Sequence, residues 1–321
     1  MTKSPFLESV RQEIRTMRYS IKTEKSYLWW IKGFILFNDK KHPNDMGNHE
    51  IERFLNHLAI NRQVSSATQN QALCAIIFMY KNVIQREIKN LKYGFTKRDR
   101  AIPTVLTHEE AMQIIGNLKD KYWLIASLLY GCGLRINEAL KLRVKDLNLA
   151  DNTLFVFRGK GRKDRYTLLP KSLNESIKNQ IEKAKLIHHK DTCEGYGLTS
   201  LPPSLIRKYG HAAKDFSWQY LFPSSIRCEH PHDGYICRHH IHETAFRKQL
   251  RQAVLKTGIA KRVKAHTFRH TFATQLLLNG TDIRTVQELL GHSDLRTTEL
   301  YTHVIGSRFS HTISPFDRKV I

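Results

Sequence analysis

Acidic side chains, cysteines and long apolar runs are all scarce in this sequence. Its 29 Asp and Glu residues face 52 Lys and Arg residues, for a formal net charge of +23. The five cysteines (Cys74, Cys132, Cys193, Cys228 and Cys237) are an odd number for 321 residues, and no apolar run precedes a cleavage site at the start. We therefore expect reduced thiols and no secretory signal. The longest uncharged windows, 63–80 and 122–134, are shorter than the ~20 apolar residues that span a bilayer, so we expect a cytoplasmic protein with no membrane partner.

The excess of positive charge is spread over the whole chain. Residues 1–100 carry 18 basic and 9 acidic side chains, which is a net charge of +9 and leaves +14 for residues 101–321. A basic surface on two folded segments suits a polyanion, because neutralising phosphates releases counterions. The charge therefore favours nucleic acid as the partner, and a basic protein that uses its charge only for solubility is the alternative.

Residues 7–86 show the spacing of amphipathic helices. Apolar side chains recur three or four positions apart in three groups: Tyr27, Trp30, Ile31 and Ile35; Ile51, Phe54, Leu55 and Leu58; Leu73, Ile76, Ile77 and Tyr80. Turn-like segments at 38–48 and 61–66 separate them. We expect three or four helices in a small helical domain over residues 1–88, followed by a basic interdomain linker over residues 89–106.

The second expected domain covers residues 107–321. Thr107 and Glu110 form a plausible capping box at the start of a helical pattern that continues to Leu140. Residues 153–158 and 165–169 are rich in β-branched and other apolar side chains, which predicts a β-hairpin with its turn at 159–164. Residues 172–187 and 243–303 return to helical spacing, and 191–242 are irregular. We therefore expect a mainly α protein of two domains, the second an α+β domain with one small antiparallel sheet.

The second domain holds a set of residues suited to phosphate chemistry. His266 and Arg269 lie three residues apart at a helix start, where a guanidinium fork and an imidazole can bind phosphate oxygens or move a proton. His292 follows a predicted helix end, and the phenol of Tyr301 comes nine residues later. Taken singly, the His-Arg pair is more often structural and an isolated tyrosine more often packs in a core.

Three more candidates lie upstream. Arg135 is expected in the first turn of a helix after the glycine pair 131 and 133, with Glu138 one turn later. Lys160 lies in the hairpin turn, where glycines let the backbone approach a ligand closely. The alternatives are a solvated ion pair for Glu138 and a solubilising edge for Lys160.

The order and spacing of Arg135, Lys160, His266-x-x-Arg269, Gly291-His292 and Tyr301 resemble the tyrosine recombinase (phage integrase) family over residues 107–303. The resemblance implies that the N-terminal segment is a core-binding domain and that the second domain is catalytic. Tyr301 would attack the scissile phosphate to form a 3′-phosphotyrosine, and Arg135, Arg269 and His292 would bind its non-bridging oxygens. Lys160 would protonate the 5′-hydroxyl leaving group, and His266 would assist.

The resemblance also implies no metal and no cofactor. It implies a protein that is a monomer when free and a homotetramer on DNA, with residues 305–321 packed on a neighbouring subunit through Phe309 and Phe316. Two other readings stay open: a relaxing topoisomerase with the same nucleophile, and a DNA-binding module without chemistry.

About 97 residues separate the hairpin from His266, and the extra segment at about 191–242 resembles the insertion of integron integrases. Those enzymes recognise folded single-stranded cassette sites, as well as a duplex attachment site, through bases that protrude from a hairpin. Flat or rigid side chains would stack on such bases: Trp218, Tyr220, Pro231, His239 and His240. Of these, Trp218, His239 and His240 resemble the family pattern most. A general recombinase on duplex sites is the alternative, as is Trp218 as a core strand residue.

The same segment offers seven possible zinc ligands: Cys228, His230, His232, Cys237, His239, His240 and His242. Its two cysteines are nine residues apart, unlike a Cys-x₂₋₄-Cys knuckle. We therefore expect no structural zinc there.

Overall fold

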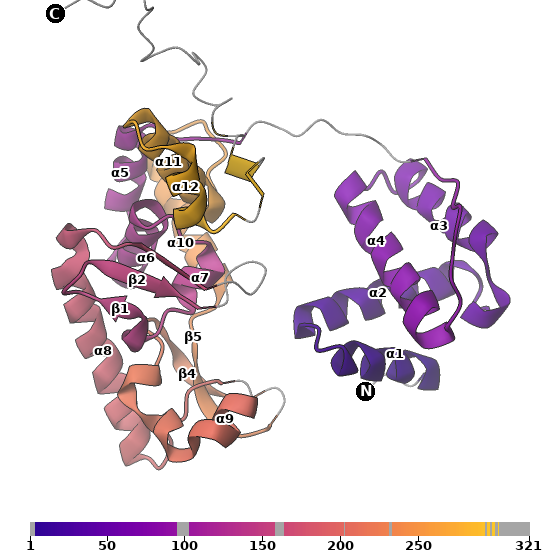
Figure 1. Cartoon of the computed structure of the whole chain (residues 1–321), viewed down its shortest axis with the longest axis horizontal. Coiled ribbons are helices and arrows are strands. Elements are labelled where there is room, and N and C mark those ends of the chain that lie inside the picture. The colour runs from indigo at the N-terminus through magenta and orange to yellow at the C-terminus, as the bar shows by residue number, and fades with distance from the viewer. Residues whose placement is uncertain are drawn as a thin grey trace, which may run out of the picture. The chain divides into compact units, whose positions relative to one another are not determined.

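The computed structural model describes residues 4–94, 103–157, 164–201, 203–230, 233–292, 294–295, 297–298 and 301. It divides the chain into two compact units, residues 1–100 and 101–321 (Figure 1). Lys160, Pro231, Phe309 and Phe316 lie outside the described residues. The domain boundaries at residues 88 and 107 stay predictions.

The first unit is a helical bundle, as expected. Its elements are α1 (Pro5–Thr16), α2 (Ile21–Phe37), the 3-10 helix η1 (Pro43–Asp45), α3 (Asn48–Ile60), α4 (Ser66–Phe78) and the π-helix η2 (Met79–Ile84). The hydroxyls of Ser4, Ser20 and Ser65 accept hydrogen bonds from the first backbone N–H groups of α1, α2 and α4. The apolar stripes face one core that contains Ile14, Ile31, Phe34, Ile51, Leu55 and Ile76.

The chain after η2 is held on α3 by side chains. Glu52 Oε1 accepts from the Lys92 N–H at 2.6 Å, and Asn56 Oδ1 accepts from the Gly94 N–H at 3.2 Å. Gln69 Nε2 donates to the Gly94 carbonyl at 3.1 Å. These bonds satisfy backbone groups that have no strand partner, so residues 92–94 belong to the first unit.

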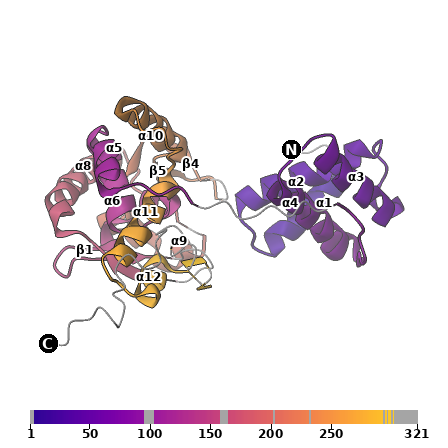
Figure 2. The same cartoon turned by 90° about the horizontal axis from the view of Figure 1, so that it is seen from above.

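The second unit begins with the helices that form its core. These are α5 (His108–Gly116), α6 (Asp120–Gly131) and α7 (Ile136–Leu140), and the expected capping box of Thr107 and Glu110 is present at α5. Helix α6 is buried along most of its length and packs against α5 and α11 (Ala265–Leu278) (Figure 2). Helices α10 (Glu243–Thr257) and α12 (Ile283–Leu290) complete the expected C-terminal helices.

The expected hairpin is the larger part of a three-stranded antiparallel sheet. After the 3-10 helix η3 (Val144–Asp146), the strands β1 (Leu147–Asn148), β2 (Thr153–Val156) and β3 (Arg165–Leu168) lie in the order β1-β2-β3. Strands β2 and β3 pair from Thr153 with Leu168 to Val156 with Arg165. Strand β1 was not predicted because a strand of two residues is too short to show the alternation of apolar and polar side chains.

The expectation of a single sheet, and of an irregular segment at 191–242, is wrong. Helix α8 (Asn174–Cys193) runs past the predicted end. The segment that follows contains α9 (Pro203–Tyr209) and the 3-10 helices η6 (Gly210–Lys214) and η7 (Phe216–Trp218). Strands β4 (Pro223–Glu229) and β5 (Ile236–His240) then form an antiparallel pair with an irregular register. Polar side chains fill most of both strands, so no alternating apolar pattern marks them. The buried Asp191 carboxylate accepts from Arg238 Nε at 2.8 Å and fixes the pair to α8.

In the part of the chain that the structure describes, none of the helices combines the length and the apolar character that crossing a membrane requires.

Candidate active site

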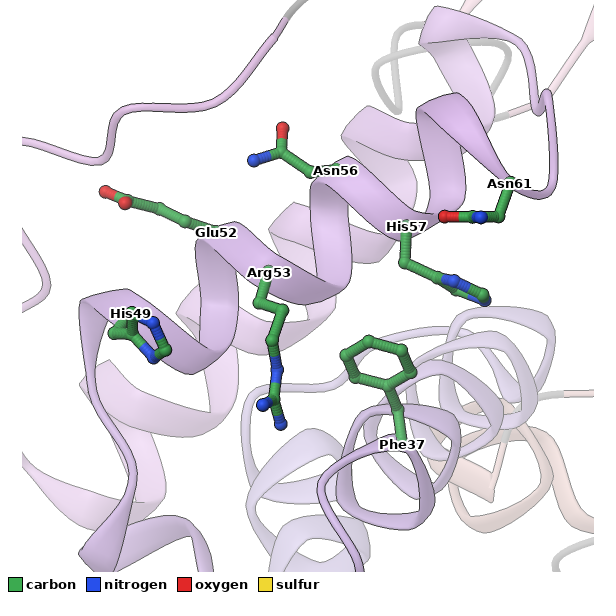
Figure 3. A pocket seen from close by; sticks show the side chains of 7 residues that line it. All are labelled: Phe37, His49, Glu52, Arg53, Asn56, His57 and Asn61. Carbon is green, nitrogen blue, oxygen red and sulfur yellow. The ribbon is translucent and has the colours of Figure 1, made fainter.

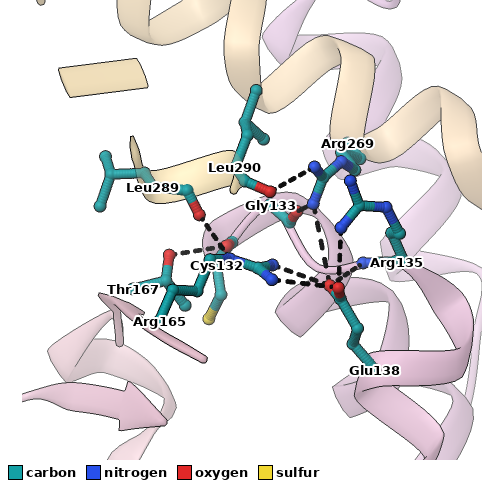
Figure 4. Close-up of polar contacts among 9 residues, drawn as sticks. All are labelled: Cys132, Gly133, Arg135, Glu138, Arg165, Thr167, Arg269, Leu289 and Leu290. Atoms are coloured by element: carbon teal, nitrogen blue, oxygen red, sulfur yellow. Dashed lines mark hydrogen bonds and ion pairs between the residues drawn. The ribbon is translucent and has the colours of Figure 1, made fainter. Parts of the chain in front are cut away.

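Three guanidinium groups surround the carboxylate of Glu138 (Figure 4). Arg135, the residue before α7, donates to it through its backbone N–H at 2.9 Å and through Nη1 at 2.8 Å. Arg165, the first residue of β3, donates through Nη1 at 3.0 Å and Nη2 at 2.8 Å. Arg269 Nη1 lies 3.8 Å from the same carboxylate. Three cations around one anion leave two excess positive charges.

Burial and neighbouring charges shift the pKa values of Glu138 and Arg269 in this cluster. Burial alone would raise the pKa of Glu138, but the hydrogen bonds and charge of Arg165, followed by those of Arg135, lower it to about 2. Burial and the charge of Arg135 lower the pKa of Arg269 to about 9. The solvated ion pair considered for Glu138 is therefore wrong, because its side chain is only 9% exposed. A cluster of this kind favours the binding of a further anion.

Arg269 is the most buried member of the cluster. Its side chain is fully buried in α11, and its Nη1 and Nη2 donate to the carbonyls of Gly133 at 2.7 Å and Leu290 at 2.5 Å. Gly133 has a φ of +63°, and a Cβ at this position would clash with the ring of Phe272. A glycine at 133 is therefore needed to let the α6–α7 turn approach α11.

Arg165 joins the cluster to the end of α12. Its Nε donates to the Leu289 carbonyl at 2.9 Å. Gly291 ends α12 with a φ of +65°, and a Cβ there would lie 2.8 Å from Arg165 Cδ. The next residue is His292, whose Nδ1 and Thr298 Oγ1 form a hydrogen bond of 2.9 Å. Arg165 thus connects the hairpin strand, Glu138 and the segment that carries His292.

Tyr301 lies beside the cluster and is 2% exposed. Its hydroxyl oxygen and His270 Nδ1 are 3.0 Å apart in a hydrogen bond. The rings of His292 and Tyr301 are nearly parallel, with centroids 6.2 Å apart, and the ring edge of His266 meets His270 at 4.5 Å. Burial raises the pKa of Tyr301, and the nearby charges of Arg269 and Arg135 oppose that rise.

The structure brings together Arg135, Arg269, His292 and Tyr301. His266 contacts His270, which in turn bonds Tyr301. Two members of this group, Arg165 and His270, were not predicted from the sequence. For His270 the signal was its i,i+4 spacing from His266, which puts both imidazoles on one helix face. For Arg165 it was the period of two in β3, which puts Arg165 on the same face as the buried Thr167.

The inserted segment is anchored to the end of α7 by Arg143. The Arg143 guanidinium donates to the Ser200 carbonyl at 3.0 Å, to Thr199 Oγ1 at 3.1 Å and to the Trp218 carbonyl. It also stands 4.4 Å from the centre of the Tyr220 ring. Arg143 therefore holds the segment around Trp218 and Tyr220 against the helix that starts beside Arg135.

Two of the residues expected to stack on bases, His239 and His240, lie beside Tyr220. His239 and His240 lie in β5 with ring centroids 5.4 and 5.2 Å from Tyr220. Burial, and then the neighbouring His239, lower the pKa of His240 to about 4, so this ring is neutral at pH 7. Trp218 is half-buried at the end of η7, so its assignment to a core strand is wrong. Lys145 Nζ stands 3.0 Å from the centre of the indole ring.

Within the described residues, no group of three or more His, Cys, Asp or Glu side chains is arranged to hold a metal ion. His230 instead stacks on Tyr235, with ring centroids 4.6 Å apart. Cys228 and Cys237 face each other across β4 and β5 as free thiols. His232 lies outside the described residues.

The first unit has a groove of about 450 Å³ along α3 (Figure 3). Its lining is polar and basic, with one aromatic ring: Phe37, His49, Glu52, Arg53, Asn56, His57 and Asn61. Arg53 stands 5.4 Å from the centre of the Phe37 ring, and the His57 ring lies 4.8 Å from it. The groove offers cations and a flat ring to a polyanion.

Comparisons with known proteins agree with these features. Residues 104–308 match the model of the Phage integrase family, and residues 6–90 match that of the Phage integrase, N-terminal SAM-like domain. An integrase/recombinase of Escherichia coli is 42% identical over 97% of this chain and 93% of its own length. A tyrosine recombinase of Pseudothermotoga lettingae is 31% identical over 90% of this chain and 89% of its own. The solved structure of the XerH site-specific recombinase bound to palindromic difH substrate shares the fold, with a TM-score of 0.61 and 21% identity over 94% of this chain and 82% of that one. The chain therefore belongs to the phage integrase family of tyrosine recombinases, enzymes that cut and rejoin DNA strands by transesterification.

Proposed function

We propose that this recombinase uses Tyr301 as its nucleophile and acts as an integron integrase that integrates and excises gene cassettes. The observation that carries the nucleophile is the position of the buried Tyr301 phenol beside Arg135 and Arg269, where both cations act on its pKa. A scissile phosphate bound there would meet an attacking oxygen and two guanidinium groups at once. Its negative charge would offset the excess positive charge around Glu138.

The other roles follow from this arrangement and from the family resemblance. Arg135 and Arg269 bind the non-bridging oxygens as charge develops on them, and His292, held by Thr298, donates to a third position. Lys160 protonates the 5′-hydroxyl as it leaves, and His266 assists from its place next to His270. The covalent 3′-phosphotyrosine keeps the energy of the phosphodiester, so a new 5′-hydroxyl can rejoin the strand without ATP or a metal.

The inserted segment supports the cassette assignment. Trp218, His239 and His240 come from two separate parts of the sequence. His239 and His240 lie beside Tyr220, and Arg143 contacts both the Tyr220 ring and the Trp218 carbonyl. A neutral imidazole and an indole offer flat faces to unpaired bases, at about 1–3 kcal/mol per stacked base for an aromatic ring. With Pro231, these residues would read bases that protrude from a folded single strand.

One contact favours the alternative of a recombinase that acts only on duplex sites. Lys145 Nζ lies over the indole of Trp218 at 3.0 Å and covers one face of it. Base stacking therefore uses the opposite face or displaces the lysine. If neither occurs, Trp218 serves only to pack the insertion against η3.

Covalent trapping on two matched DNAs tests the assignment. The substrates are a nicked cassette-site hairpin with protruding bases and a duplex of the same sequence with those bases paired, and the product is a protein–DNA adduct that survives denaturation. We expect the wild-type protein to favour the hairpin and Trp218→Ala to lose that preference. Tyr166→Ala, which removes an exposed aromatic ring on β3, is the control and should keep it. Equal adduct on both DNAs with the wild-type protein would contradict the cassette assignment and leave the recombinase.

We further propose that the protein is a monomer when free and a homotetramer on DNA, with residues 305–321 reaching a neighbouring subunit. Light scattering of the protein alone and with DNA carrying two sites measures the number of protomers directly. Removing residues 306–321 should preserve binding to one site and weaken the pairing of two. Wild-type recombination by the truncated protein would contradict the proposal.

A further inference from the structure

We propose that His270 is a further catalytic residue, which accepts the phenol proton of Tyr301 as the phenol oxygen attacks the scissile phosphorus. This inference rests on the proposed role of Tyr301 as nucleophile. It assigns the proton that the nucleophile must lose to a side chain that is hydrogen-bonded to the phenol.

The geometry singles out His270. Its Nδ1 is 3.0 Å from the Tyr301 hydroxyl oxygen, which is within reach for direct proton transfer. Among the described residues this is the hydrogen bond that the structure records at that hydroxyl. Because Tyr301 is 2% exposed, bulk water has little access to the phenol, so a side chain has to take its proton.

The two other histidines of the site are engaged differently. His292 bonds Thr298 through Nδ1 and lies with its ring parallel to Tyr301 at 6.2 Å between centroids, which suits a ring placed beside the phosphate. His266 contacts the ring of His270 edge to face at 4.5 Å between centroids. His270 is therefore the imidazole that touches the reacting oxygen.

At pH 7 the His270 imidazole is in the neutral form that a proton acceptor needs. The ring is faced by His266 and Tyr301, and the guanidinium of Arg269 lies close enough to act on it. Burial first, and then the charges of His266 and Arg269, lower the pKa of His270 to about 4. The imidazole is therefore neutral at pH 7, and with its proton on Nε2 it leaves the Nδ1 lone pair for the phenol.

The step balances without any further reagent. The Tyr301 O–H proton passes to His270 Nδ1 while the phenol oxygen forms a bond to phosphorus, and the bond from phosphorus to the 5′-oxygen breaks. The 5′-oxygen takes its proton from the general acid, for which Lys160 is proposed. In the rejoining step the incoming 5′-hydroxyl displaces the phenolate, which recovers its proton from the imidazolium of His270. Two positive charges from Arg135 and Arg269 stay on the phosphate throughout.

Two substitutions separate proton transfer from positioning. His270→Asn places an amide oxygen near the position of Nδ1, so it can accept a hydrogen bond from Tyr301 but cannot take the proton. His270→Ala removes both functions and leaves space for added imidazole. The control is His189→Ala, which removes an exposed imidazole from α8. Thermal unfolding and DNA binding of all variants show that they are folded.

The measurement is the rate of covalent adduct formation on a nicked site that the wild-type protein cleaves. At pH 7 we expect both His270 variants to be slower by about 100-fold or more, which is the usual range for a lost general base, and His189→Ala to match the wild type. Added imidazole should restore part of the rate of His270→Ala. The defect should shrink as the pH rises towards the pKa of the phenol. Wild-type rates with His270→Asn would overturn the proposal, and so would a faster His270→Ala, which would make His270 a restraint on Tyr301.

A second substrate separates this role from that of the general acid. A 5′-phosphorothiolate at the scissile position has a sulfur leaving group that needs no proton, so it rescues the loss of an acid and does not rescue the loss of a base. We expect His270→Ala to stay slow on this substrate. Restoration of its rate would overturn the proposal by placing His270 at the leaving group. If the wild-type protein forms no adduct on any DNA, the proposed role of Tyr301 as nucleophile is contradicted. If the wild-type protein forms adduct and His270→Ala forms it as fast, only the proposed role of His270 is contradicted.

Discussion

Both Nη atoms of Arg165 donate to the carboxylate of Glu138, at 3.0 and 2.8 Å, while Nε donates to the Leu289 carbonyl at 2.9 Å. All three bonds are made by a guanidinium that is only 9% exposed. A planar fork with this geometry sets the distance between β3, α7 and the end of α12. Arg135 before α7 and His292 after α12, both proposed to bind the phosphate, therefore share one support.

Replacing Glu138 by Gln should be strongly destabilising. The change removes the carboxylate that balances Arg135, Arg165 and Arg269 among the described residues, and an uncompensated buried charge costs about 3–5 kcal/mol. Urea unfolding at pH 7 measures the change in the free energy of unfolding. Glu175→Gln on α8, whose side chain is 79% exposed, is the control and should change it by less than about 0.5 kcal/mol. Equal stabilities of the two variants would show that Glu138 is not the centre of the cluster.

Arg165→Lys should slow the formation of the covalent protein–DNA adduct, with only a minor effect on the free energy of unfolding. Lysine keeps the charge near Glu138 but cannot make the paired bonds and also reach the Leu289 carbonyl, so the segment with His292 loses its support. We expect a drop of 10-fold or more in the rate of covalent trapping, at unchanged DNA binding. Arg247→Lys, at an exposed i,i+4 pair on α10, is the matched change and should keep the wild-type rate. Equal rates for the two variants would contradict the supporting role of Arg165.

The helical spacing was sufficient to predict the bundle and the C-terminal helices, because amphipathic stripes are local in the sequence. Arg135 and Tyr301 could be proposed as site residues from their distinctive neighbours in the sequence, and the structure brings them together. Glu138 was visible, but its burial was not, because that depends on Arg165 approaching from β3. A contact between residues 27 positions apart leaves no local signal.

The second hairpin shows the same limit. Strands β4 and β5 are polar, and one end of the pair is fixed by Asp191 from α8 rather than by an apolar face. A search for alternating apolar residues cannot detect such strands. His270 was missed for another reason, since its partner Tyr301 is 31 residues away and the spacing from His266 marks only a shared face.

Gly133→Ala should lower both stability and activity. A side chain at this φ of +63° is strained by about 1–2 kcal/mol, and the clash with Phe272 should add about 1–3 kcal/mol. Relief of this clash also moves the Gly133 carbonyl, which accepts a hydrogen bond from Arg269, and so disturbs Arg269. Gly195→Ala also has a positive φ, of +81°, but its Cβ would meet no atom within 4 Å, so it measures the strain alone. A loss no larger than that of Gly195→Ala, as measured by chemical denaturation, would contradict the close packing of α6 and α11.

Stability should fall as the pH is lowered from about 6.5 to 4. His240 and His270 have folded pKa values of about 4, below the ~6.5 of an unfolded histidine, so the unfolded chain binds protons first. Their contribution is complete above pH 6.5 and is lost as the pH falls towards 4, with a slope of at most about 1.4 kcal/mol per pH unit for each histidine. Denaturant unfolding at pH 7, 6 and 5 measures the slope, which His270→Asn should reduce. A stability that does not change over this range would contradict the neutral, buried state of both rings.

Tyr301 is proposed to become covalently joined to DNA, and mass spectrometry can test this on the adduct itself. The adduct is trapped on a nicked site, the protein and DNA are digested, and the modified peptide is located. We expect a nucleotide on Tyr301, and no adduct at all with Tyr301→Phe at unchanged DNA binding. A nucleotide on any other residue, or an undiminished adduct with Tyr301→Phe, would contradict it.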